Sequence, residues 1–127
     1  MPLVRIDVLQ DRAAEQLPAI GDAVHRALVA EIAVPERDRF QIIARHPPGL
    51  LVFDPEYLGI HRTAHIVIVQ ITMSLGRTLE QKKALIAAIA RNLSALPDLR
   101  PEDVFVNLVE VVKENWSFGN GIAQYAV

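Results

Sequence analysis

The sequence contains no cysteine among its 127 residues. That absence excludes disulfide bonds, thiol nucleophiles and zinc–thiolate sites. An excess of charge of one sign is also lacking. The formal net charge is −2, which does not favour a phosphate-binding surface, so we expect no nucleic-acid partner. The four histidines show no metal-ligand spacing, so we expect no metal and assign them to the surface or to packing: His25, His46, His61 and His65.

Long hydrophobic runs are missing as well. No apolar stretch approaches the roughly 20 residues needed to span a bilayer, and no basic region followed by an apolar run marks a signal peptide. We therefore expect a cytoplasmic protein with no membrane partner. The chain is 51% hydrophobic and 22% charged, the balance of a globular protein, and its length is enough for one domain with a real core.

The sequence repeats itself without a gap. A shift of 65 residues aligns identical residues along both halves, so we predict a single domain, 1–127, built of two pseudo-repeats at about 1–62 and 63–127. The most informative identities are Arg12 with Arg77, Gln16 with Gln81, Asp38 with Asp103 and Phe40 with Phe105.

The first half has the pattern β-α-β. Alternation of apolar and polar residues over 4–8 predicts a strand with one buried face. A helix is predicted from about Ala13 to Ala33, capped by Asp11, and a second strand from Arg39 to Ala44. The apolar stripe of this helix contains Leu17, Ile20, Val24 and Leu28.

The second half repeats the pattern. We predict a strand at Ile66–Val69, a helix capped by Thr78 that ends at about Leu96, and a last strand at Phe105–Val112. The connector Arg45–Ala64 and the tail after Lys113 should form turns and short hairpins. The inward residues of the second helix are predicted to be Ile86, Ile89, Leu93 and Leu96.

These elements predict an α+β fold of two β-α-β repeats. Strands within each half should be parallel, and the two halves should form a four-stranded sheet with both helices on one face. The other face of the sheet would be left open. Its apolar side chains need cover, so we expect a closed oligomer.

Pro2 is the most informative single residue. It follows Met1 directly, and removal of Met1 would leave a secondary amine able to take up and release a proton. As an internal residue, Pro2 is a tertiary amide without an N–H and without basicity. Many chains begin with Met-Pro for no chemical reason. Whether Pro2 is a catalytic amine or an ordinary residue therefore has to be judged from the rest of the sequence.

The chain resembles the tautomerase superfamily, and within it malonate semialdehyde decarboxylase. The resemblance covers nearly the whole chain and is carried by Pro2-Leu3, 34–41 (VPERDRFQ), 76–78 (GRT) and 116–121 (WSFGNG). It implies the tautomerase fold, a homotrimer, and an enzyme that needs neither metal nor organic cofactor. The implied partner is a small oxo-acid substrate, that is, a short 2-oxo or 3-oxo carboxylic acid.

The same resemblance implies roles for particular residues. Pro2 is the acid/base, Arg77 holds the substrate carboxylate, and Asp38 holds a water or steers proton transfer. Trp116 and Phe118 line the pocket. Leu75, also in the pocket, stands where the decarboxylase pattern commonly has a second arginine. This departure removes one cation, which Arg45 or Arg62 in the connector could replace.

Several alternatives remain open at this stage. Neutral Pro2 would favour keto–enol tautomerisation, whereas protonated Pro2 would favour decarboxylation or hydration aided by Asp38. Arg12, the repeat mate of Arg77, is either functional or a structural echo. A different class of function is a non-catalytic oligomeric binding or signalling protein with the same fold, and retention of Met1 would favour it.

Overall fold

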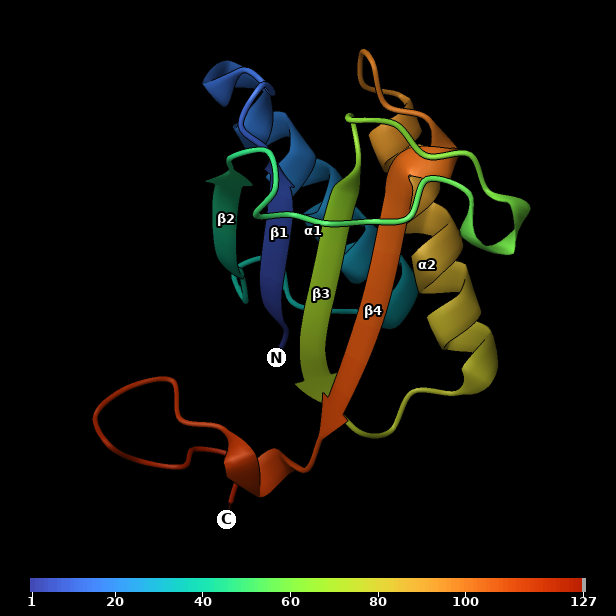
Figure 1. Cartoon of the computed structure of the whole chain (residues 1–127). Helices are drawn as coiled ribbons and strands as arrows, with labels where there is room; N and C mark the ends of the chain where they lie inside the picture. The colour runs from blue at the N-terminus through green and yellow to red at the C-terminus, as the bar shows by residue number, and fades with distance from the viewer. Residues whose placement is uncertain (127) are drawn as a thin grey trace.

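Four strands and two long helices follow one another as two β-α-β units (Figure 1). The computed structural model describes residues 1–126. The first unit contains β1 (Leu3–Leu9), α1 (Leu17–Ile32) and β2 (Phe40–His46), and the second contains β3 (Val67–Ser74), α2 (Leu79–Ser94) and β4 (Val104–Val111). Short 3₁₀ turns lie at Ala14–Gln16, Tyr57–Gly59, Pro101–Asp103 and Lys113–Asn115.

The strands form one mixed sheet in the order β2-β1-β3-β4. β1 is parallel to β2, and β3 is parallel to β4, whereas β1 and β3 meet antiparallel at the centre. Both helices cover the same face of this sheet (Figure 1). The predicted fold class, parallel pairing within each half and one-sided helix layer are therefore confirmed.

The core lies between the sheet and the helix layer. Strand residues that point toward the helices are buried, as in Val4, Ile6 and Val8 of β1, which are at most 1% exposed. Their hydrophobic burial stabilises the fold by roughly 1.5–3 kcal/mol for each large side chain. The helices supply the matching side chains Ile20, Val24, Leu28, Leu85, Ile89 and Leu93.

The predicted facing of α2 is wrong at one position. Ile86 is 41% exposed, and its neighbour Leu85 is fully buried in its place. Successive helical residues are separated by about 100°, so only one residue of an adjacent apolar pair can face the sheet. Leu96 and Leu17 are partly buried and pack against the core, as expected.

The start of the first helix also differs from the prediction. α1 begins at Leu17 after a separate 3₁₀ turn, its N-cap residue is Gln16, and no side chain caps it. Asp11 is therefore not the cap. Pro18 lies in the first turn of α1, where its missing N–H leaves no hydrogen bond unmade.

Two further boundaries need correction. β3 continues to Ser74, well beyond the predicted Val69, because it pairs with β1 on one side and β4 on the other. Within residues 1–126, the connector and the tail after Lys113 contain turns and 3₁₀ segments but no hairpin. None of the helices in this range is long and apolar enough to cross a membrane.

α2 is capped by Thr78, as predicted. The Thr78 hydroxyl accepts from the Gln81 backbone N–H at 3.1 Å, and the Gln81 side chain accepts from the Thr78 N–H at 2.9 Å. This reciprocal pair satisfies two N–H groups at the helix start.

We expect Thr78→Ala to lower the free energy of unfolding by about 1 kcal/mol, because one of these donors loses its acceptor. Thr78→Ser, which keeps the hydroxyl, should stay close to the wild type. Urea unfolding at one fixed protein concentration measures both. Equal stability of the Ala and Ser variants would contradict the capping role.

Candidate active site

The N-terminus of the chain lies at one end of the central strands. Leu3 pairs with Phe40 of β2 and with Thr72 of β3, so Met1 and Pro2 lie beside the start of β2 and the end of β3. Pro2 is buried, and its nitrogen is part of the Met1–Pro2 peptide bond. The turn that carries Asp38 and the loop that carries Arg77 reach this same end of the sheet.

Asp38 contacts the N-terminus directly. The Met1 amino group donates a hydrogen bond to the Asp38 carboxylate, although the two residues are far apart in sequence. Asp38 lies in a turn after α1, in which its own N–H donates to the Pro35 carbonyl at 2.9 Å. The buried His25 fixes the same turn, because its Nε2 lies 2.8 Å from the Glu36 carbonyl oxygen.

The environment of this amino group disfavours positive charge. Burial lowers the pKa of the Met1 amino group to about 6, and the positive charge of Arg77 acts in the same direction. Burial and Arg77 therefore favour the neutral form of the Met1 amine, whereas its contact with the Asp38 carboxylate favours the charged form. An amine whose two forms are balanced in this way can take up and release a proton, and its contact with Asp38 fixes its position.

Arg77 lies in the loop between β3 and α2. Gly76 precedes it with φ of +128°, a backbone conformation that favours glycine, and the Arg77 Nη1 donates to the Ser74 carbonyl at 3.2 Å. Arg77 lines a cavity of about 270 Å³ together with Met1, Ser74, Leu75, Gly76, Gln81 and Lys113. None of the described residues that line it is a carboxylate, so the cavity favours an anion.

A second, aromatic cavity of about 230 Å³ lies on the other side of the N-terminus. Pro2, Leu3 and Phe40 line it together with Trp116, Ser117 and Phe118 from the tail. The Trp116 and Phe118 rings stack with centroids 5.6 Å apart and planes 10° apart. The tail lies below the sheet (Figure 1), and its Trp116 and Phe118 line the same cavity as Pro2.

Ser74 joins the two cavities. Its hydroxyl accepts from the Trp116 indole N–H at 3.0 Å and donates to the Met1 sulfur at 3.3 Å. Met1 lines the basic cavity and Pro2 lines the aromatic one, so the nitrogen of Pro2 lies at their junction.

All six residues proposed for the site from the sequence gather around this end of the sheet. They are Pro2, Asp38, Leu75, Arg77, Trp116 and Phe118. Four further residues of these cavities were not predicted as site residues: Ser74, Phe40, Gln81 and Lys113. Gln81 stood out only as the repeat mate of Gln16, which does not point to a site, and nothing in the local sequence marks Lys113.

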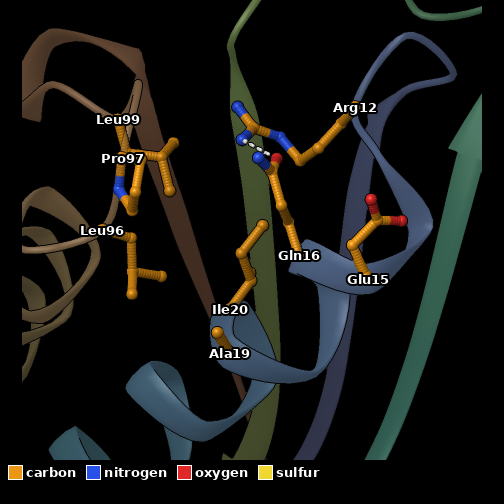
Figure 2. Close-up of a pocket in the computed structure, with 8 residues that line it drawn as sticks. All are labelled: Arg12, Glu15, Gln16, Ala19, Ile20, Leu96, Pro97 and Leu99. Carbon is orange, nitrogen blue, oxygen red and sulfur yellow. Dashed lines mark hydrogen bonds between the residues drawn. The ribbon is translucent and has the colours of Figure 1, made fainter.

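Arg12 does not reach this site. Its Nη2 donates to the His65 carbonyl at 2.8 Å and its Nη1 to Gln16 at 3.3 Å. Figure 2 shows these side chains at one end of a cleft of about 200 Å³, which is closed on the other side by Leu96, Pro97 and Leu99. Burial lowers the pKa of the Arg12 guanidinium, against the opposing effect of Asp98 and Asp103.

The second repeat therefore has no counterpart of the N-terminal amine. Val67 stands where Pro2 stands in the first repeat, and the chain before it occupies the corresponding place. Asp103, the repeat mate of Asp38, accepts instead from the Thr63 backbone N–H at 2.6 Å and hydroxyl at 2.9 Å. Arg12 therefore bonds to the His65 carbonyl and to Gln16, and Asp103 bonds to Thr63 and Arg100, with no N-terminal amine between them. This arrangement favours the structural echo over a functional role for Arg12.

Comparisons with known proteins identify a family that matches this chain. Two family models described as "Tautomerase enzyme" match residues 38–119 and 2–60. The probable tautomerase YusQ of Bacillus subtilis (strain 168) is 39% identical, with 98% of each chain covered.

Two solved structures are similar over nearly the whole chain. FG41 malonate semialdehyde decarboxylase, inhibited by 3-bromopropiolate, has 43% identity and a TM-score of 0.91, with 97% of this chain and 93% of that one covered. A wild-type fused 4-OT, a symmetric trimer, has 26% identity and a TM-score of 0.80, with 98% of each chain covered.

Proposed function

The chain belongs to the tautomerase family, and we propose that it uses the amine of Pro2, freed by loss of Met1, as acid/base on short 2-oxo or 3-oxo carboxylic acids. One observation carries this proposal: the partly buried N-terminal amine contacts the Asp38 carboxylate, and burial together with the positive charge of Arg77 lowers its pKa to about 6. The same two influences, burial and Arg77, would act on a Pro2 amine one residue further along.

Keto–enol tautomerisation follows directly from this arrangement. The Arg77 guanidinium binds the substrate carboxylate with its planar fork. Neutral Pro2 removes the proton next to the carbonyl, and the electron pair moves to the carbonyl oxygen to form the enolate. Return of a proton to the oxygen gives the enol. Trp116 and Phe118 line the cavity beside Pro2, and their apolar surface favours the neutral form of the amine.

Decarboxylation or hydration is the alternative reaction at the same site. There, protonated Pro2 would polarise the carbonyl of a 3-oxo acid, and the bond to the carboxylate would break as carbon dioxide leaves. Hydration would instead add a water held by Asp38. The similarity to FG41 malonate semialdehyde decarboxylase supports this candidate.

Asp38→Asn separates the two reactions. We expect it to lower decarboxylation or hydration of malonate semialdehyde by roughly 100-fold, because the group that holds water or steers the proton is lost. Tautomerisation of phenylpyruvate should change only a few-fold, since Pro2 and Arg77 carry it. Turnover of both substrates by wild type and variant makes the comparison, with Asp22→Asn on the exposed side of α1 as the control.

A panel of oxo acids with no turnover at any pH would contradict the enzymatic proposal. A non-catalytic oligomeric binding or signalling protein is then the remaining candidate. The specific observation in its favour is that Met1, when present, lines the basic cavity and contacts Asp38 and Ser74. Mass spectrometry of the natural protein shows whether Met1 is retained.

The open face of the sheet supports a homotrimer. Leu3, Phe40, Ile42, Phe105 and Val109 are each 36–48% exposed, and no helix of residues 1–126 covers this face. Burying such a surface between copies removes apolar area from water. The fused 4-OT neighbour is a trimer. A monomeric mass in solution would contradict the assembly.

A further inference from the structure

We propose that Lys113 is the second cation of the basic cavity and binds a second oxygen group of the substrate, so that the site selects acids with a carboxylate and another anionic or carbonyl oxygen close by. The inference rests on the proposed function, since it assigns a substrate class to that same site. Lys113 would also supply the cation that is missing at Leu75, where a second arginine is commonly found.

The fold brings Lys113 to Arg77. Ser74 at the end of β3 pairs with Val111 at the end of β4, and the Leu75 N–H donates to the Val111 carbonyl at 2.9 Å. Lys113 follows two residues later, at the start of a 3₁₀ turn. Lys113 and Arg77 therefore line the same cavity from two loops held together by the β3–β4 ladder.

The charges around the cavity leave Lys113 available to an anion. Within residues 1–126, Lys113 makes no ion pair with a carboxylate. The nearest acid on β4, Glu110, is paired with Lys82 at 3.0 Å. The ordinary alternative for Lys113 is a solvated side chain at the rim, and its exposure keeps the expected effect moderate.

The other cations considered from the sequence do not fill this place within the chain. Arg62 donates through Nη1 to three connector carbonyls, at 3.3, 3.0 and 3.2 Å, and is used there. Arg45 pairs in register with Val8, near the end of β1 away from Pro2. Leu75 itself is 52% exposed and offers no polar atom to an anion.

The chemistry of the two cations suits two oxygen groups. Arg77 offers a planar fork that matches a carboxylate, whereas Lys113 is a point charge on a flexible stem that can follow a less fixed oxygen. A cation near the carbonyl oxygen would also stabilise the negative charge that develops there when Pro2 removes a proton.

Lys113→Met tests this assignment by binding alone. The probes are malonate, which has two carboxylates, and propionate, which has one, measured by titration calorimetry. We expect Lys113→Met to weaken malonate binding about fivefold and to leave propionate unchanged. Lys113→Arg should bind malonate like the wild type. Lys83→Met, an exposed lysine on α2 outside the cavity, is the matched control.

Unchanged malonate binding in Lys113→Met, or an equal loss in Lys83→Met, would overturn the assignment. Because no turnover is needed, this result is separable from the proposed function. If the protein turns over oxo acids but its malonate binding does not depend on Lys113, only the role of Lys113 is contradicted. If malonate binding depends on Lys113 but the protein turns over no oxo acid, the role of Lys113 is supported and only the catalytic proposal is contradicted.

Discussion

Replacing Pro2 by alanine is expected to lower kcat for phenylpyruvate by roughly 100-fold, near the lower end of what a positioned acid/base contributes. Alanine at the same place still leaves an amine once Met1 is removed, but it lacks the ring that packs beside Phe40 and Trp116. The amine would therefore be less fixed in position. Steady-state turnover of phenylpyruvate measures the effect.

A second variant removes the amine altogether. Two residues added before Pro2 turn its nitrogen back into a tertiary amide without basicity, and we expect turnover to fall to the background. Pro48→Ala, in the exposed connector, is the matched control and should behave as wild type. Full activity of the extended protein would defeat the proposed mechanism, because no other group of the site has been assigned the proton.

Replacing Arg77 by alanine should change two independent measurements. Loss of a charge-assisted hydrogen bond to the substrate carboxylate costs about 1.5–3 kcal/mol, which corresponds to roughly a 10- to 150-fold fall in kcat/KM. We expect this to appear mainly as a higher KM. Arg26→Ala, on the exposed side of α1, controls for the loss of one positive charge.

The pH dependence gives the second measurement. Arg77 is one of the two causes that lower the pKa of the Met1 amine. We expect it to act in the same way on a freed Pro2 amine, so its removal should raise that pKa. For proton abstraction the active form is the neutral amine, and kcat/KM falls as pH drops through its pKa. The acidic limb of the profile should therefore move to higher pH in Arg77→Ala.

Arg77→Lys keeps the charge and loses the fork. Its acidic limb should stay near that of the wild type, while KM remains raised. If kcat/KM of the wild type instead falls as pH rises through the pKa of the amine, the protonated form is the active one, and decarboxylation or hydration becomes the favoured reaction.

Most of the architecture could be predicted because its causes are local. Alternation over residues 4–8 encodes a half-buried strand, and Thr78 with Gln81 encodes a helix start within four residues. The failures also have local causes. Asp11 is as good a cap by type as Thr78, but the chain makes an extra 3₁₀ turn before Pro18.

The site was predictable only where a residue type carries its own chemistry. Pro2, Asp38 and Arg77 stood out through family resemblance, and the structure brings them to one place. Lys113 and Ser74 did not stand out, because their position depends on the pairing of β3 with β4 across a whole helix. Such long-range register is not written in any short window of sequence.

Under the proposed mechanism, covalent continuity at Val67 limits the number of reaction centres in each chain. A side chain can be exchanged by one codon, but a chain terminus cannot be added in the middle of a polypeptide. The chain thus has one N-terminal amine for its four strands, however similar the sequences of its two repeats are. A second such nitrogen would require a chain break directly before Val67. The preceding residues, whose His65 carbonyl now accepts from Arg12, would also have to move away.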